Sequence, residues 1–259
     1  MKVEEFMETD VITVGKNDSI TTAVNVMRKE GISHLVVLKE KRVIGVLSEK
    51  DILIKLGTER LRTLEPSRLH VSSFMSINPL TISPDDDINK AVRIFLGKNI
   101  GILPVVEKGK MVGIITKQDL MELLFEYNRL QVSSIATYNP ISVKPTDKYL
   151  NARKIITEKM FSALPVIEER NIKGIVTDFR AMEALTSFQD FVEWRHRKER
   201  IQTLLVNEIM ERIPPVVSSD TTVAEVARKM KNGLKALIVL ENNIPAAIVT
   251  KTDLLRCLL

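Results

Sequence analysis

Hydrophobic and polar positions follow the same order four times along the chain. Each time, an apolar opening segment leads to a stretch with apolar residues at helical spacing. Two short apolar runs separated by a polar turn follow, and then a second helical stretch. In the first copy the helical spacing is carried by Ile20, Ala23, Val24 and Met27. The pattern predicts a β-α-β-β-α order for each copy, and therefore an α/β (α+β) fold built from four repeats.

The step from the last strand to the second helix is nearly the same in the four copies. It reads GVLSEKDIL at 45–53, GIITKQDLM at 113–121, GIVTDFRAM at 174–182 and AIVTKTDLL at 247–255. A lone unit of about 50 residues is only marginally stable, so we expect the repeats to bury their sheets against each other in pairs. The expected repeats cover 1-56, 70-127, 128-186 and 204-259, in two modules, 1-127 and 128-259.

Polar residues mark where the helices should begin. Asp18, Asp87, Asp147 and Thr222 stand at the expected N-cap of the first helix of each repeat, where a side-chain oxygen accepts from free N–H groups. The linker 186–203 lacks Gly and Pro and has apolar residues at helical spacing, so it predicts an amphipathic helix. This helix carries the densest basic run of the chain, WRHRKER at 194–200.

Composition indicates an ordinary globular protein of a reducing compartment. Of the 259 residues, 44% are hydrophobic and 27% are charged. The net charge of +5 is a mild excess that does not by itself indicate a nucleic-acid partner. The single cysteine, Cys257, excludes an intrachain disulfide. The N-terminus has no signal-peptide core and no apolar run is long enough to cross a membrane, so a cytoplasmic protein without a membrane partner is expected.

The sequence contains no pattern typical of an enzyme. Its three histidines lie far apart, and it has no cysteine pair, zinc-protease motif or glycine-rich phosphate loop. Acidic residues occur singly in the junctions and not as a catalytic pair. We therefore expect a non-enzymatic protein with no metal and no cofactor.

The junctions share the pattern S/T-x-x-D, which has a purely structural interpretation. Ser48 and its equivalents would cap the following helix, and the acidic residue three positions later would favour the helix dipole. A carboxylate at that place can also accept hydrogen bonds from two neighbouring hydroxyl groups, and helix N-termini attract phosphate. Both interpretations can hold at once.

The order of apolar opening, helix, h-P-V strand and G-h-h-[ST]-x-x-D junction resembles the CBS domain. Four copies resemble two tandem pairs (Bateman modules) packed into a flattened disc. Stand-alone archaeal CBS proteins and the gamma subunit of AMP-activated protein kinase have this arrangement. The resemblance implies that the junction Asp binds the ribose hydroxyls of an adenine nucleoside, with the Ser or Thr beside the ribose and phosphate.

Carried over by position, the resemblance implies three ribose sites. The first has Ser48 and Asp51, with Ala23, Ile32 and Ser33 near the base; the second has Thr116 and Asp119, with Ala91, Ile100 and Gly101; the last has Thr250 and Asp253, with Leu234 and Lys235. Asp119 is expected to mark the best site, because the partner repeat supplies Ser33 and His34 across the cleft.

The third repeat departs from the pattern. It keeps Thr177 but has Arg180 in place of the carboxylate, and an arginine cannot accept the ribose hydroxyls. We expect this repeat to bind no ribose, and Arg180 to reach the phosphate held at the Asp253 site. Of the positions before the h-P-V strands, only His34 and Lys235 are basic; further phosphate contacts are expected from lysines within the junctions, Lys50, Lys117 and Lys251.

The resulting functional hypothesis is a sensor of adenine nucleotides such as AMP, ADP or ATP. It would regulate a partner protein through relative movement of its repeats, which requires only that the ligand prefers one arrangement. Three alternatives remain: an S-adenosylmethionine sensor, a nucleic-acid-binding regulator that uses the basic 186–203 helix, and a scaffold whose motifs only cap helices. A second copy of the chain is a further expected partner.

Overall fold

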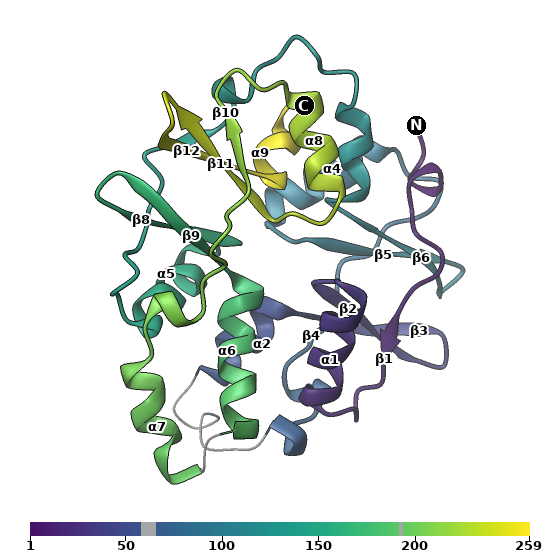
Figure 1. Cartoon of the computed structure of the whole chain (residues 1–259). Coiled ribbons are helices and arrows are strands. Elements are labelled where there is room, and N and C mark those ends of the chain that lie inside the picture. The colour runs from purple at the N-terminus through teal and green to yellow at the C-terminus, as the bar shows by residue number, and fades with distance from the viewer. Residues whose placement is uncertain (58–65, 192–193) are drawn as a thin grey trace.

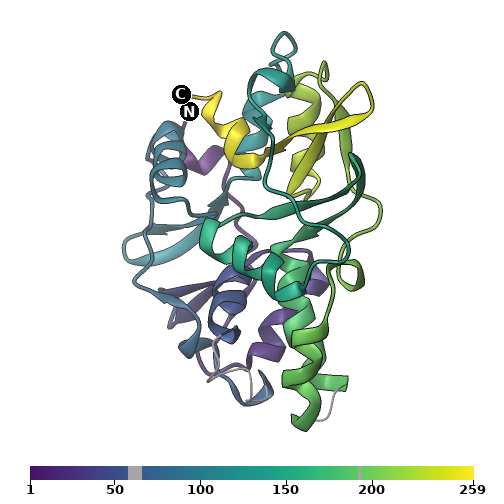
Figure 2. The same ribbon diagram turned by 90° about the vertical axis from the view of Figure 1, so that its left-hand side faces the viewer.

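The four repeats surround a common centre. The computed structural model describes residues 1–57, 66–191 and 194–259. Repeats 1 and 2 form module 1 and lie on one side, whereas repeats 3 and 4 form module 2 and lie on the other (Figure 1). The molecule is thinner when turned by 90° (Figure 2), as expected of a flattened disc. The predicted α/β fold of four repeats is confirmed.

Each repeat contains the predicted elements in the predicted order. Repeat 1 has η1 (Val3–Glu5), β1 (Thr13–Val14), α1 (Ile20–Glu30), β2 (His34–Lys39), β3 (Arg42–Ser48) and α2 (Glu49–Leu56), followed by the short helix η2 (Pro66–Arg68). Repeat 2 has η3 (Val71–Ser73), β4 (Ser76–Ile77), α4 (Ile88–Lys98), β5 (Ile102–Glu107), β6 (Lys110–Thr116) and η4 (Asp119–Leu124). The last of these, η4, is a 3-10 helix where the other repeats have an α-helix.

Module 2 repeats this order. Repeat 3 has η5 (Val132–Ser134), β7 (Thr137–Tyr138), α5 (Tyr149–Lys159), β8 (Ala163–Glu168), β9 (Asn171–Thr177) and α6 (Asp178–Phe191), and α7 (Trp194–Thr203) links it to repeat 4. Repeat 4 has η6 (Val206–Glu208), β10 (Val216–Ser218), α8 (Val223–Lys231), β11 (Ala236–Glu241), β12 (Ile244–Thr250) and α9 (Lys251–Arg256).

The linker 186–203 is helical over its described parts, in the end of α6 and in α7. Ile201 and the following Leu204 are buried, as an amphipathic helix requires. The side chains of 187–198, which include most of the basic run, lie outside what the structure describes. No helix in the described ranges is both long and apolar enough to traverse a bilayer.

The N-cap predictions are half right. Asp87 and Thr222 accept from backbone N–H groups at the starts of α4 and α8, as expected. The prediction is wrong for Asp18 and Asp147. Each of these carboxylates instead accepts, at 2.8 Å, from the backbone N–H three residues earlier and closes a turn before the helix. The N-cap therefore falls on the next residue.

The openings are exchanged between the two repeats of a module. In module 1, β4 of repeat 2 pairs with β3 of repeat 1, and Glu8 of repeat 1 bridges to Ile114 in β6 of repeat 2. In module 2, β7 pairs with β12, and Glu211 of repeat 4 bridges to Ile175 in β9. Each junction is therefore flanked by the opening of the other repeat in its module.

The exchanged openings explain the glycine that begins three of the junctions. A β-carbon at Gly45 would lie 2.6 Å from the sulfur of Met75 in the opening of repeat 2. A β-carbon at Gly113 or Gly174 would approach the opening of the other repeat in the module just as closely. In repeat 4 the position is Ala247, and the opening paired with β12 has Ala136 where Met75 stands in the opening of repeat 2. A glycine in the junction thus faces a methionine in the opening, and an alanine in the junction faces an alanine.

Two large hydrophobic cores join the modules. One is formed mainly by repeats 1 and 3, where α2 packs on α6, and the other by repeats 2 and 4, where η4 packs on α8. Within each module the sheets also bury apolar residues against each other, as predicted, in smaller clusters such as Val36, Val46 and Ile102. The four junctions thus lie between the two large cores.

Candidate functional site

The four junctions converge on one connected cavity of about 1300 Å³ at the centre of the molecule. In each repeat, a strand ends at the Ser or Thr of the motif. A helix begins at the next residue in repeats 1, 3 and 4, and at Asp119, three residues later, in repeat 2. The junction Ser or Thr of all four repeats lines this cavity. The candidate site is therefore shared between the two modules.

The carboxylate of each intact motif serves its own turn with one oxygen. Oδ2 of Asp51 accepts from the N–H of Ser48 at 2.9 Å and from its hydroxyl at 2.6 Å. Asp119 and Asp253 make the same two bonds to their own junction threonines. The capping interpretation is confirmed for Ser48 and Thr250. It is wrong for Thr116, because the N-cap of η4 is Gln118. In all three motifs, Oδ1 of the carboxylate takes no part in these bonds.

Exposed apolar side chains lie beside three of these junctions. Ile12, Leu80 and Ile141 hold the same position in the openings of repeats 1, 2 and 3 and line the cavity. Their exposed fractions are 37%, 48% and 45%. Because the openings are exchanged, Leu80 belongs beside Asp51, Ile12 beside Asp119 and Ile141 beside Asp253. These three residues were not identified from the sequence. Their only signal in the sequence is an apolar residue two positions before another apolar residue in each opening.

Most predicted site residues line the cavity. These are Ile32, Ser33, His34, Ser48, Lys50, Asp51, Ile100, Gly101, Thr116, Lys117, Asp119, Thr177, Leu234, Lys235, Thr250, Lys251 and Asp253. Ala23 and Ala91 do not: both are fully buried in the hydrophobic cores, so their predicted place near a base is wrong. They lie on the helix faces that pack inward and not on those that face the cavity.

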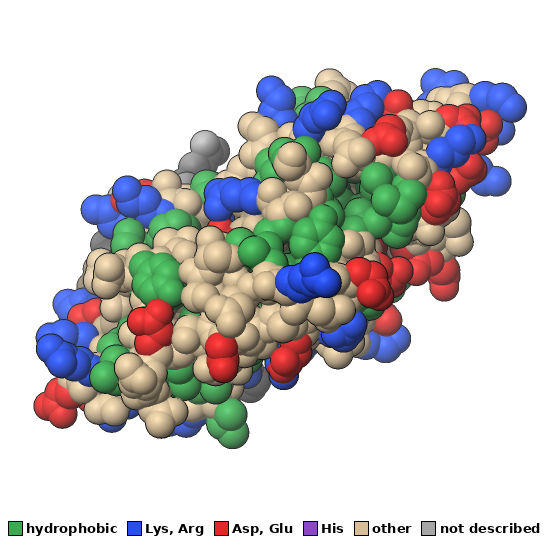
Figure 3. All heavy atoms as spheres, turned by 90° about the horizontal axis from the view of Figure 1, so that it is seen from above, with side chains coloured by type: hydrophobic (Ala, Val, Ile, Leu, Met, Phe, Trp, Pro, Cys, Tyr) green, Lys and Arg blue, Asp and Glu red, His purple; other side chains and the backbone are tan. Residues whose placement is uncertain are grey.

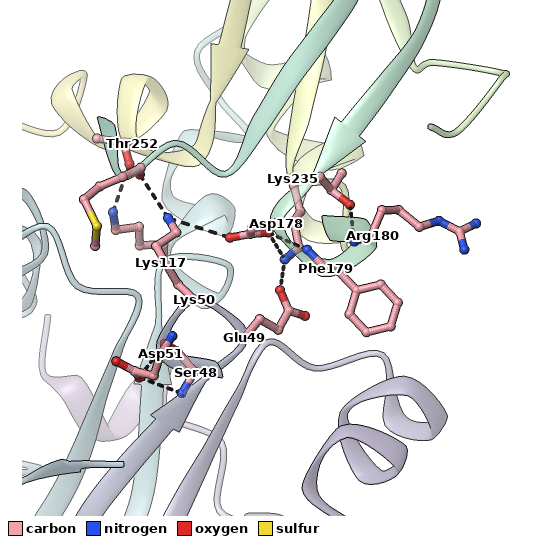
Figure 4. Close-up of polar contacts among 12 residues, drawn as sticks. Ser48, Glu49, Lys50, Asp51, Lys117, Asp178, Phe179, Arg180, Lys235 and Thr252 are labelled. Atoms are coloured by element: carbon pink, nitrogen blue, oxygen red, sulfur yellow. Dashed lines mark hydrogen bonds and ion pairs between the residues drawn. The ribbon is translucent and has the colours of Figure 1, made fainter. Parts of the chain in front are cut away.

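Arg180 is engaged away from the cavity. Its guanidinium donates to Glu183 at 2.8 Å and lies 3.4 Å from Glu211 in the opening of repeat 4. Figure 4 shows the side chain pointing away from the central cluster. The predicted contact with a phosphate at the Asp253 site is therefore not what this arrangement provides. Two carboxylates within reach satisfy the guanidinium locally.

A buried ionic cluster joins the modules beside the cavity (Figure 4). Lys235 of repeat 4 forms ion pairs with Glu49 of repeat 1 and Asp178 of repeat 3. The two carboxylates are only 3% and 6% exposed. Burial acts against the charge of Lys235, but attraction by Asp178 and Glu49 outweighs it and raises the pKa of Lys235. Burial also disfavours the charged form of Glu49, and this raises the pKa of Glu49 to about 7. The charge of Lys235, a predicted phosphate contact, is therefore already paired with two carboxylates.

Two more predicted phosphate contacts are accounted for otherwise. Lys50 donates to the carbonyl of Met160 at 2.9 Å and lies 3.7 Å from Asp178. His34 is partly buried, and this burial lowers its pKa to about 3, so the imidazole is neutral near pH 7. Its ring covers Gly101, where a β-carbon would approach to 2.5 Å. Ser33 and His34 both line the cavity, but a neutral His34 brings no positive charge to the Asp119 site.

Lys117 and Lys251 form a reciprocal pair across the modules. Lys117 donates to the Thr252 hydroxyl at 2.9 Å, and Lys251 donates to the Gln118 side-chain oxygen at 2.8 Å. Among the residues described, neither ammonium group has an ion-pair partner. Burial lowers the pKa of each lysine to about 8. The cavity thus holds two cations whose hydrogen-bond acceptors are uncharged, a setting that suits an anion.

The two lysines give a pH dependence whose sign is fixed. Their folded pKa of about 8 lies below the ordinary 10.5, so between these values the unfolded chain binds more protons. Stability of the ligand-free protein should therefore rise with pH in this range, by roughly 2 kcal/mol for each lysine from pH 7.5 to 9.5. Denaturant unfolding checks this. The double variant Lys117→Met/Lys251→Met should lose the rise, and an equal rise in both proteins would contradict the assignment.

Similar proteins share the repeat. The CBS domain family matches residues 3–57, 71–126, 132–187 and 206–259. A protein from a ribosomal RNA operon of Thermofilum pendens is 22% identical over 245 residues, which cover 88% of this chain and 81% of that one. Protein MJ1225 of Methanocaldococcus jannaschii is 25% identical over 272 residues, covering 95% and 94%.

Solved structures show the same fold. The crystal structure of MJ1225, proposed to be an archaeal homologue of gamma-AMPK, superposes with a TM-score of 0.86 at 22% identity, and both chains are covered completely. A conserved protein of Pyrococcus horikoshii superposes with a TM-score of 0.66 at 22% identity, again over the whole of both chains. Among the residues described, no cluster of His, Cys, Asp or Glu could hold a metal ion.

Proposed function

The chain belongs to the CBS domain family, and we propose that it is a non-enzymatic sensor of adenine nucleotides of the AMP, ADP or ATP type. One observation carries the proposal. A carboxylate with an oxygen left over, an exposed apolar side chain and the cationic pair Lys117 and Lys251 line the same cavity. These are the three chemistries that a ribose, a base and a phosphate require.

Each nucleotide lies between two repeats in this proposal. At the Asp51 cleft, the base packs against Leu80 from the opening of repeat 2, and the ribose hydroxyls donate to the free oxygen of Asp51. The phosphates extend toward the centre, where Lys117 and Lys251 lie. The Asp119 and Asp253 clefts also have a junction carboxylate and an apolar side chain, with Ile12 and Ile141 in place of Leu80.

Regulation follows from where the clefts lie. Because an exchanged opening forms one wall and a junction of the partner repeat forms the other, a bound nucleotide favours one relative position of the two repeats. The junctions also hold the contacts between modules, so movement at one cleft is transmitted to the centre. A partner protein that binds one arrangement better reads this shift.

The alternatives have less support. S-adenosylmethionine shares the adenosine but carries a positive sulfonium and no phosphate, which disfavours it beside Lys117 and Lys251. Nucleic-acid binding depends on the 194–200 run, most of whose side chains lie outside the described part. On the face seen in Figure 3, basic side chains are interspersed with acidic ones and form no continuous basic surface.

Ligand-linked stability tests the proposal. AMP, ADP or ATP at 100 times its dissociation constant should add about 2.7 kcal/mol of stability for each site filled. Thermal unfolding measures this, with GMP as the control for the base and 2′-deoxy-AMP as the control for the ribose hydroxyls. The absence of a shift with every adenine nucleotide would reject the proposal, and a shift with S-adenosylmethionine alone would favour that ligand instead.

A further inference from the structure

The Oδ1 atoms of the three junction carboxylates have different surroundings. Oδ1 of Asp253 accepts from Arg256 at 2.8 Å. Oδ1 of Asp119 lies 3.8 Å from the ammonium group of Lys231. Oδ1 of Asp51 has no hydrogen-bond or ion-pair partner among the described residues. The three motifs, nearly identical in sequence, are therefore not equivalent.

We propose that Lys231 and Arg256 are built-in competitors of the ribose hydroxyls, so that the Asp51 cleft takes the first nucleotide. The proposal rests on the proposed function and adds an order of filling that the motifs alone do not contain. It reverses the order expected from the sequence, where Asp119 comes first. Lys231 and Arg256 weaken binding at their own clefts and so set the order in which the clefts fill.

Counting acceptors gives the physical reason. A carboxylate oxygen has about two places for a donor. In all three motifs, Oδ2 already accepts from the backbone N–H and the hydroxyl of the junction residue. Oδ1 of Asp51 can therefore accept both ribose hydroxyls, whereas Oδ1 of Asp253 shares its places with Arg256.

At Asp119 the competition is electrostatic. A distance of 3.8 Å is too long for a hydrogen bond, but at this distance the ammonium group and the carboxylate form an ion pair. Lys231 is held there because it also pairs with Glu122 at 2.8 Å, and its carbonyl accepts from Gln118 at 2.9 Å. A ribose at Asp119 must weaken this charge pair or share the carboxylate with it.

The two competitors differ in one respect. Arg256 belongs to the same helix as Asp253, whereas Lys231 ends α8 in module 2 and reaches Asp119 in module 1. Binding at Asp119 therefore opposes a contact between modules, and binding at Asp253 does not. Of the three clefts, the Asp119 cleft is therefore the one in which ligand binding directly affects a contact between repeats 2 and 4.

Calorimetric titration with adenosine tests the proposal, because adenosine has no phosphate and leaves Lys117 and Lys251 out of the comparison. Lys231→Met should tighten the Asp119 site and Arg256→Met the Asp253 site, each by about 5-fold, the usual size for a partly exposed ion pair. Lys229→Met is the matched control, since among the described residues Lys229 pairs only with Glu225 on its own helix. It should leave all affinities unchanged.

Site assignment comes from repeating the titrations with Asp51→Ala, Asp119→Ala and Asp253→Ala. The tightest wild-type phase should vanish only in Asp51→Ala. The proposal is overturned if Asp119→Ala or Asp253→Ala removes that phase, or if Lys231→Met and Arg256→Met change no affinity by more than 2-fold. If wild type binds neither adenosine nor any adenine nucleotide, the proposed function itself fails and the order of filling fails with it.

Discussion

Lys235→Met is expected to lower the free energy of unfolding by about 3–5 kcal/mol, the usual cost of removing one partner from a buried ion pair. The ammonium group is the cation that pairs with both Glu49 and Asp178, and both carboxylates are nearly inaccessible to water. Without it, two acidic groups from different modules face each other, with Lys50 at 3.7 Å from Asp178. Either a carboxylate takes up a proton or the modules separate locally.

Urea unfolding at pH 7 measures the effect. Lys229→Met, on the exposed side of α8, is the control and should change stability by less than about 0.5 kcal/mol. The double variant Glu49→Gln/Lys235→Met removes the repulsion together with the cation and should recover part of the loss. A cost below about 1 kcal/mol for Lys235→Met would show that the cluster does not hold the modules together.

Asp51→Ala is expected to weaken the tightest adenine-nucleotide site about 100-fold. Two hydrogen bonds to a charged acceptor together contribute on the order of 3 kcal/mol, which corresponds to that factor. The variant also loses half of the capping box of α2, because Oδ2 of Asp51 accepts from the N–H and the hydroxyl of Ser48. A separate loss of about 1 kcal/mol in the stability of the ligand-free protein should therefore accompany the binding defect.

Calorimetry with AMP and ATP separates the two effects of Asp51→Ala. Asp18→Ala is the matched control, because Asp18 closes a similar turn by accepting from Gly15 at 2.8 Å but does not line the cavity. It should cost stability and leave binding intact. An unchanged dissociation constant in Asp51→Ala would mean that the junction motif only caps its helix.

The repeat and its elements could be predicted because their signals are local. The spacing of Ile20, Ala23, Val24 and Met27 predicts α1, and all four residues are buried. The junction motif likewise predicts its own capping bonds, since donor and acceptor are three residues apart. Such features depend on neighbouring residues and little on the rest of the chain.

The exchange of openings and the state of the lysines could not be predicted. A short strand such as β4 has too few residues to specify its partner by hydrophobic pattern. Lys50, Lys117 and Lys251 look alike in their motifs, but their partners come from the other module. Whether a buried lysine meets a carboxylate, a carbonyl or a hydroxyl depends on packing between distant segments.

The exchanged openings also set the smallest piece of this protein that evolution could copy, transplant or lose. If one repeat were removed, the opening of the other repeat would have no sheet to pair with, and its sheet would have an unpaired edge strand. Unpaired edge strands tend to associate with other chains. Duplication of a whole pair creates no such orphan. Gene growth by steps of two repeats is therefore the route that keeps every intermediate foldable, and the first such ancestor would have needed a second copy of itself to cover its helices.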